Sequence, residues 1–119
     1  MKTDLPERTF AFALRVVNLC KHLDEAPGVA RTMSRQLLRS GTSIGANVEE
    51  GQGGQSRADF ISKYSIACKE ARETLYWLRL VLAAELVPET RIESLITECN
   101  ELVAILTSII KRDRENTSH

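Results

Sequence analysis

Three arginines of this 119-residue chain are spaced so that they could bind phosphate groups. Arg31, Arg35 and Arg39 follow one another at four-residue intervals, which in a helix places side chains on one face. A ridge of guanidinium groups can track the phosphates of a nucleic acid. The same spacing also fits a solvated face, or ion pairs with a neighbouring subunit. No aromatic residue interleaves with the arginines, so stacking on single-stranded bases is not supported.

Residues that usually bind metals or perform catalysis are few and scattered. His22 and His119 are the only histidines, and Cys20, Cys68 and Cys99 form no Cys-x-x-Cys pair. The cysteines are therefore predicted to be small core residues, and neither a disulfide framework nor a zinc site is expected. No histidine lies in a recognisable catalytic setting. The sequence predicts no catalytic residue, no cofactor and no small-molecule substrate.

Carboxylates are present, but their pattern does not favour a metal site. Those of the second and third predicted helices are Glu49, Glu50, Asp59, Glu70 and Glu73. A di-iron bundle needs Glu-x-x-His motifs, and the chain has none, so we expect no metal. We expect Glu70 and Glu73 to form surface ion pairs with a nearby cation: Lys63, Lys69 or Arg72.

The composition sets limits on binding partners and location. Sixteen Lys and Arg residues balance sixteen Asp and Glu residues, so the formal net charge is zero. Binding to nucleic acid or anionic lipid would therefore need a local patch. No stretch approaches the roughly 20 apolar residues of a membrane span, and residues 1–6 lack the apolar run of a secretory signal. We expect no membrane partner and a cytoplasmic location.

Periodic apolar residues and short breaks predict four helices. They cover about residues 6–24, 29–50, 56–84 and 88–112, followed by a polar tail, 113–119. Pro6, preceded by Asp4 or Leu5, fits the first turn of a helix, and Ser56 with Asp59 fits an N-terminal capping box. Short connections force consecutive helices to run antiparallel. The predicted fold is all-α, one antiparallel up-down-up-down four-helix bundle.

Glycine-rich segments occur in two places. Gly41 and Gly45 lie inside the second predicted helix, where each costs roughly 1 kcal/mol relative to Ala. Because small residues at four-residue spacing let a neighbouring backbone approach, we predict that they are helix close-packing residues. A break or kink near Gly41 is the alternative. Residues 51–55 are predicted to be a flexible connection; an anion site there is the alternative, but the segment lacks a P-loop ending.

The first and third predicted helices carry more apolar surface than one small bundle can hide. Apolar residues cover roughly 220° of the first helix, wider than the stripe of a surface helix. Large exposed apolar patches are rare on monomers, so we expect a homo-oligomer. The predicted interface residues are Phe12, Val16, Leu19 and Leu23 of the first helix and Ile66, Trp77 and Leu80 of the third.

Two blocks of sequence resemble a known family. They are residues 39–47 with Glu50 and Gly51, and Phe60 with residues 66–78. These residues resemble the bacterial four-helix-bundle family that includes proteins encoded in intervening sequences of large-subunit ribosomal RNA genes. A more distant relative is the accessory variability protein of diversity-generating retroelements. The resemblance covers roughly Phe10 to Ile110 and implies a four-helix bundle and a barrel-shaped homopentamer.

The resemblance and the residues together give two functional hypotheses. The first is a non-enzymatic, oligomeric interaction or scaffold protein whose main partner is itself. The second is an accessory factor that binds RNA or DNA, or a nucleic-acid enzyme, through Arg31, Arg35 and Arg39. The retroelement relative implies such a role, since it binds a reverse transcriptase and nucleic acid. That relative is strongly basic, whereas this chain is neutral.

Overall fold

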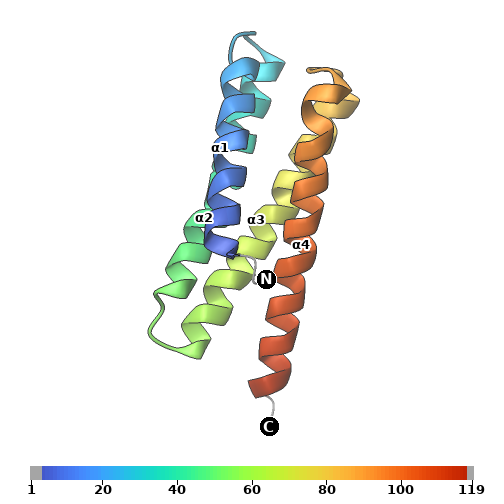
Figure 1. The fold of residues 1–119 in the computed structure, drawn as a ribbon. Helices are drawn as coiled ribbons and strands as arrows, with labels where there is room; N and C mark the ends of the chain where they lie inside the picture. Colours follow the sequence, from blue (N-terminus) through green and yellow to red (C-terminus); the bar gives the residue numbers. More distant parts are fainter. Residues whose placement is uncertain (1–3, 118–119) are drawn as a thin grey trace.

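The computed structural model describes residues 4–117, which form four helices. They are α1 (Leu5–Leu23), α2 (Val29–Gln52), α3 (Arg57–Ala83) and α4 (Glu89–Thr117). Successive helices run antiparallel as two long hairpins placed side by side (Figure 1). No strand occurs in the described part of the chain. The predicted all-α, up-down-up-down four-helix bundle is therefore confirmed.

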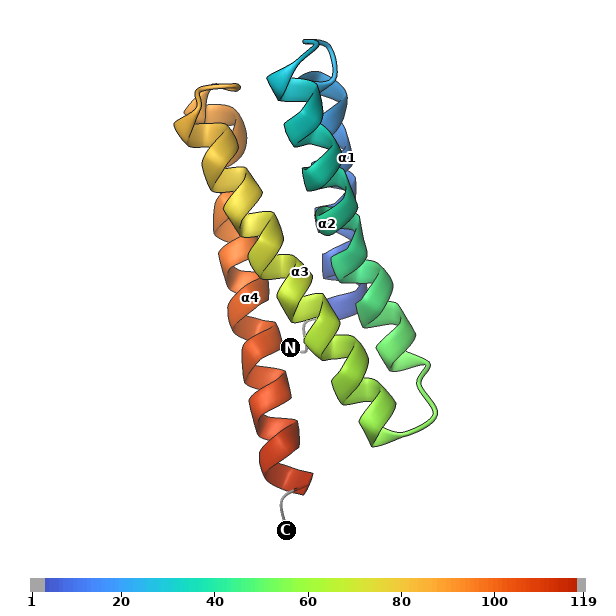
Figure 2. The same cartoon turned by 180° about the vertical axis from the view of Figure 1, so that it is seen from behind.

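The four helices are unequally packed. α2 packs along both α1 and α3, and α3 also packs along α4, whereas α1 meets α4 at only a few points. The backbones of α1 and α3 do not approach each other closely, so these helices lie diagonally across the bundle, as do α2 and α4 (Figures 1 and 2). The molecule is elongated, with extents of 52 × 23 × 22 Å. α1 begins near mid-height, so the far end of the bundle is built from the other three helices.

Side-chain caps begin α1 and α3 where the sequence indicated. The Asp4 carboxylate accepts a hydrogen bond from the Glu7 backbone N–H at 3.3 Å, and Pro6 follows in the first turn. The Ser56 hydroxyl accepts from the Asp59 backbone N–H at 3.1 Å. Each cap satisfies a backbone donor that a helix N-terminus leaves without an internal partner.

α2 passes through Gly41 and Gly45 without a break. A Cβ atom on Gly41 would lie 2.8 Å from Val16 Cγ1 of α1, and one on Gly45 would lie 3.3 Å from the Thr9 backbone. Both distances are shorter than ordinary van der Waals contact. The missing side chains therefore let α1 lie directly against α2, and this close packing compensates for the conformational cost of glycine.

The glycine-rich connection is shorter than predicted. Gly51 and Gln52 belong to α2, and the connection to α3 comprises only residues 53–56. A Cβ atom on Gly51 would lie 2.7 Å from Tyr64 Cδ1 of α3, so this glycine makes room for a buried aromatic ring. The prediction that Gly51 belongs to a flexible connection was wrong, because contact with α3 holds it inside α2.

The helical part of α4 is longer than predicted. The sequence indicated that residues 113–119 form a polar tail, but α4 continues to Thr117. Arg57 Nη1 of α3 lies 2.7 Å from Asp113 Oδ1, and this ion pair ties the last turns of α4 to the start of α3. Interhelical contacts, which local polarity does not reveal, extend the helix. The remainder of the predicted tail, residues 118–119, lies outside the described residues.

Candidate interaction surfaces

Four of the predicted interface residues lie inside the protomer. Phe12, Val16, Leu19 and Leu23 are at most 4% exposed and belong to the bundle's own core. Their spacing of four, three and four residues is that of a stripe facing inward. The prediction that these α1 residues form a subunit interface was therefore wrong: they are the face by which α1 packs on the rest of the bundle.

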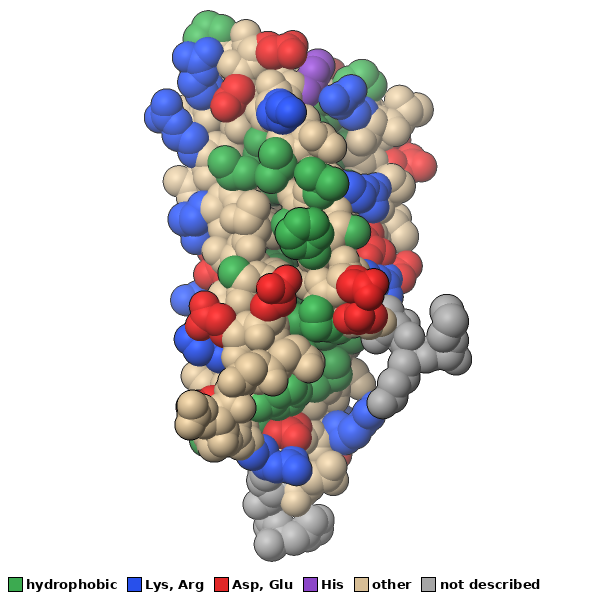
Figure 3. All heavy atoms as spheres, turned by 60° about the vertical axis from the view of Figure 1, so that its left-hand side comes forward, with side chains coloured by type: hydrophobic (Ala, Val, Ile, Leu, Met, Phe, Trp, Pro, Cys, Tyr) green, Lys and Arg blue, Asp and Glu red, His purple; other side chains and the backbone are tan. Residues whose placement is uncertain are grey.

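α1 exposes a different apolar stripe. Phe10 is 65% exposed and Leu14 is 54% exposed. The two residues are one helical turn apart and lie on the outer side of α1. Leu38 of α2 is also exposed. Ser34 and Gly41 of α2 both contact α1. Leu38 is four residues after the first and three before the second, so it lies on the edge of α2 that faces α1. Phe10, Leu14 and Leu38 form what we name the α1 patch; Figure 3 shows hydrophobic side chains gathered on this side of the molecule.

α3 carries a second exposed apolar surface, which contains the other predicted interface residues. Ile66 and Leu80 are more than one-third exposed, and Trp77, three residues before Leu80, is partly buried. Tyr76 is 56% exposed and packs edge-on against Trp77, with ring centroids 5.3 Å apart. We name these four residues the α3 patch. Because α1 and α3 are diagonal, the outer faces that carry the two patches point away from each other.

The predicted arginine ridge is divided by interactions within the protomer. Arg31 donates to the Asp24 backbone carbonyl at 2.9 Å. Arg39 forms ion pairs with Glu70, at 3.4 Å, and with Glu73. Arg35 makes no hydrogen bond or ion pair with the described residues. Two carboxylates therefore compensate the charge at one end of the ridge, which weakens its attraction for phosphates.

The carboxylates of α3 pair differently from the sequence-based expectation. Glu70 and Glu73 bind Arg39 of α2, while Lys63 reaches Glu50 of α2 at 3.0 Å. Arg72 turns instead toward α4. The predicted pairing of Glu70 and Glu73 with cations of their own helix was wrong, because the facing helix offers Arg39 across the α2–α3 contact.

Glu73 also connects this ion pair to the α3 patch. The Trp77 indole N–H donates to Glu73 Oε2 at 3.0 Å. This hydrogen bond, together with the nearby Arg39 charge, lowers the pKa of the Glu73 carboxyl. Trp77 is the single tryptophan of the chain. Its indole ring is thus fixed in orientation by an ionised carboxylate.

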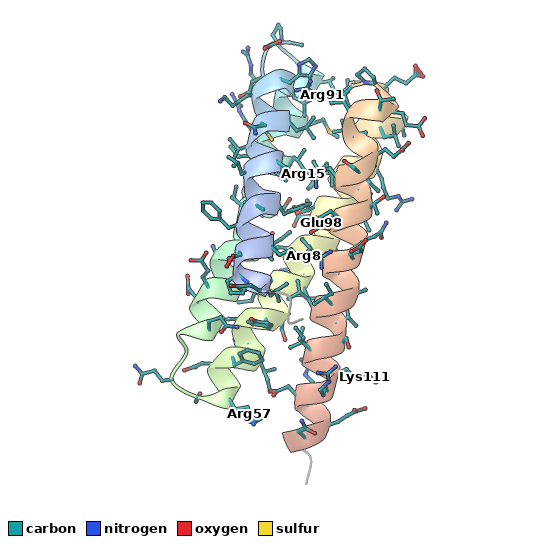
Figure 4. All side chains as sticks on the ribbon, in the orientation of Figure 1. Arg8, Arg15, Arg57, Arg91, Glu98 and Lys111 are labelled. Atoms are coloured by element: carbon teal, nitrogen blue, oxygen red, sulfur yellow. The ribbon has the colours of Figure 1, made fainter. Side chains whose placement is uncertain are left out.

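A polar seam joins α1 to α4. Arg8 Nε and Nη2 donate to the two oxygens of Glu98 at 2.7 and 2.8 Å, and Nη2 also reaches Glu101 at 2.6 Å. Farther along, Arg15 donates to the Ser94 hydroxyl at 2.7 Å (Figure 4). The hydrogen bonds to Glu98 and Glu101 raise the pKa of the Arg8 guanidinium. Sequence periodicity gave no sign of this seam, since its members are more than 75 residues apart.

The cysteines are buried and free, as predicted. Burial raises the pKa of the Cys20 thiol and raises that of Cys99 to about 12, so both remain protonated near neutrality. Among the described residues no group of three or more His, Cys, Asp or Glu side chains could hold a metal ion. No helix of that part of the chain is long and apolar enough to cross a bilayer.

The family model of the 23S rRNA-intervening sequence protein matches residues 1–108. This chain belongs to the 23S rRNA-intervening sequence protein family. The family predicted from residues 39–47, 50–51, 60 and 66–78 is thereby confirmed. No curated protein matches the chain.

A solved structure supports the same family assignment. It is the crystal structure of a protein with unknown function from the S23 ribosomal protein family of Bacteroides thetaiotaomicron VPI-5482. The two chains are 47% identical, with 89% of this chain and 97% of that chain covered, and their TM-score is 0.82. The four-helix arrangement is thus shared with a relative described only as a protein of unknown function.

Proposed function

We propose that this chain is a non-enzymatic, cytoplasmic scaffold subunit that assembles into a closed homo-oligomer. In this assembly the α1 patch of one subunit packs against the α3 patch of the next. The observation that carries the proposal is the presence of two exposed apolar surfaces on diagonally opposite helices. Resemblance to the four-helix-bundle family implies five subunits in such a ring.

The geometry favours contact between unlike patches. If each patch met its own copy, two different two-fold interfaces would be needed to cover both surfaces. A single kind of contact, between the α1 patch of one subunit and the α3 patch of the next, covers both surfaces. Every subunit in the ring then uses its α1 patch toward one neighbour and its α3 patch toward the other. Such a head-to-tail contact generates a ring when its rotation closes. Phe10, Tyr76 and Trp77 supply the aromatic groups that are enriched in protein interfaces.

Two sets of substitutions test the interface. Phe10→Asp with Leu14→Asp disrupts the α1 patch, and Ile66→Asp with Leu80→Asp disrupts the α3 patch. Each places charge on an apolar contact without changing the core stripe. We expect sedimentation velocity to show a single oligomer for the unmodified chain and a folded monomer for each double variant. Circular dichroism checks that both remain helical.

Mixing the two double variants distinguishes the kinds of interface. Each variant keeps one intact patch, so an equimolar mixture should form a dimer that cannot extend further. Contact between like patches would instead leave each double variant able to self-associate alone. Val29→Asp is the matched control, because Val29 is 68% exposed but lies at the start of α2, outside both patches. A monomeric unmodified chain, or equal loss of assembly in the control, would overturn the proposal.

A further inference from the structure

A small hollow lies between α1 and α4, in the part of the polar seam beyond Arg8. Its volume is about 200 Å³. Five residues line it, three from α1 and two from α4: Arg15, Asn18, Leu19, Arg91 and Leu95. Both leucines are buried, and both arginines are exposed and labelled in Figure 4, between the two helices. The hollow therefore combines an apolar base with two guanidinium groups, one from each hairpin.

The antiparallel register of α1 and α4 brings these two arginines to the same part of the seam. Arg8 of α1 pairs with Glu98 of α4 at 2.7 Å. Arg15 lies seven residues farther along α1, and Arg91 lies seven residues back along α4. Seven residues are about two helical turns, or about 10.5 Å of rise, so the two arginines are the next pair on the same faces. The seam thus has opposite charges at one step and like charges at the next.

No described carboxylate compensates these two cations. Arg15 donates to the Ser94 hydroxyl, a neutral acceptor, at 2.7 Å. The Arg91 guanidinium forms no hydrogen bond or ion pair within residues 4–117. Arg91 also lies in the first turn of α4, where the helix dipole favours an anion over a cation. Glu89, the acidic residue of that turn, lines a different hollow, beside Pro88. The hollow is therefore locally positive.

We propose that this hollow, which we name the α1–α4 anion site, binds a small molecule that carries a dianionic phosphate group. A phosphate monoester carries a charge of about −1.5 to −2 near pH 7, which matches two guanidinium groups. Arginine binds phosphate oxygens through parallel N–H···O bonds, and the Asn18 amide offers a further donor. The leucine base accepts a short carbon chain. A volume of about 200 Å³ is below the usual range for drug-sized ligands, so the ligand is small.

The bound phosphate links the two hairpins where they pack at only a few points. It replaces repulsion between Arg15 and Arg91 with attraction of both to one anion, and so stabilises the folded chain by mass action. The site is separate from the α1 patch, because Arg15 is about 100° around the helix from Leu14. Ligand binding is therefore tested independently of assembly.

Thermal denaturation in phosphate-free buffer tests the site. The probes are inorganic phosphate and glycerol phosphate, and the reference is sodium chloride at matched ionic strength. At about ten times its Kd, measured by titration calorimetry, each bound probe should raise Tm by roughly 5 °C relative to chloride. Tighter binding of glycerol phosphate identifies a phosphate ester as the ligand, and equal affinities identify free phosphate. Both results support the site.

Three single variants locate the binding. Arg15→Ala and Arg91→Ala should each weaken affinity for the probes by at least about tenfold, because each removes a charged hydrogen-bond donor. Arg35→Ala is the matched control, since Arg35 is an exposed arginine of α2 that makes no interaction with the described residues. Its affinity should stay within about twofold of the unmodified chain, because no ligand contact is lost.

Two further readouts separate an anion site from a merely structural contact. Without phosphate, Arg91→Ala should not lower Tm, because it removes a like charge rather than a bonded partner. Ser94→Asp places a carboxylate beside Arg15, so it should raise Tm without phosphate and remove most of the phosphate-dependent shift.

Three outcomes would overturn the α1–α4 anion site. The first is that neither phosphate probe raises Tm more than chloride does. The second is an equal loss of affinity in Arg35→Ala, which would indicate a diffuse charge effect. The third is a phosphate-dependent shift that persists in both Arg15→Ala and Arg91→Ala, which would place the ligand elsewhere.

Discussion

α1 contacts its two neighbours in opposite ways. Toward α2 it presents Val16 and Thr9 to glycines, and the helices meet with little space between them. Toward α4 it presents Arg8 and Arg15, whose long side chains reach Glu98 and Ser94 across a wider separation (Figure 4). One contact depends on shape and the other on charge.

The difference shows how a short helix can be held in a bundle of longer ones. A tightly packed apolar contact becomes much less stable when atoms are added to it or displaced. The α1–α2 contact therefore fixes the register of the first hairpin. Charged side chains tolerate variation in distance, so the α1–α4 seam can join two hairpins that pack only at a few points. The first contact therefore joins α1 to α2 within one hairpin, and the second joins that hairpin to the other.

The largest expected effect comes from filling the α1–α2 contact. Gly41→Val should lower the free energy of unfolding by about 3 kcal/mol, because the added atoms overlap the β-branched Val16 side chain. Urea denaturation followed by circular dichroism measures the change. Adding Val16→Ala should relieve part of the overlap, so that the double variant costs less than the sum of the single variants. Strict additivity would show that Val16 is not the obstacle.

The α1–α4 seam should be less costly to break. Arg8→Ala should cost about 2 kcal/mol, because it leaves the half-buried Glu98 carboxylate without its bidentate partner. Arg15→Ala, which removes an exposed arginine from the same seam, should cost no more than about 0.5 kcal/mol. Both changes are measured by urea denaturation. Equal costs for the two variants would contradict the special role of the Arg8–Glu98 pair.

A change in the second hairpin supplies a reference that touches neither contact of α1. Glu85 follows the end of α3 with φ of 59°, a left-handed conformation that favours glycine. Glu85→Gly should therefore raise the free energy of unfolding by about 1 kcal/mol. Because the site is remote from α1, its effect should add to those of Gly41→Val and Arg8→Ala. Thermal denaturation of the single and combined variants tests this additivity.

The smallest effect should be the acid sensitivity of the α2–α3 ion pair. The pKa of Glu73 is lowered from its ordinary value of 4.5, so its stabilising contribution is complete above that pH. That contribution, about 0.5 kcal/mol for a partly exposed pair, is lost as the pH falls through the lower folded pKa. Trp77 fluorescence should report this titration directly. The signal should be flat over the same range in Glu73→Gln.

Much of the fold followed from local patterns. Apolar periodicity predicted four helices, the Ser56 and Asp4 caps were recognisable from residue type, and glycines four residues apart predicted a close approach of two helices. The seam of Arg8 with Glu98 could not be predicted, because nothing local in either segment indicates a partner that far along the chain. The last turns of α4 were missed for the same reason, since their support comes from Arg57.

The predicted subunit interface shows most clearly what could not be predicted from the sequence. The sequence by itself determined that α1 is too apolar to have one buried stripe, because residues 10 and 14 repeat at helical spacing beside residues 12, 16, 19 and 23. It could not determine which stripe faces inward. Only the tertiary structure decided this, since Gly41 and Gly45 of α2 fit Val16 and Thr9 and so rotate Phe10 and Leu14 toward solvent. Periodicity fixes the angle between two faces of a helix, but only packing against another helix chooses between them.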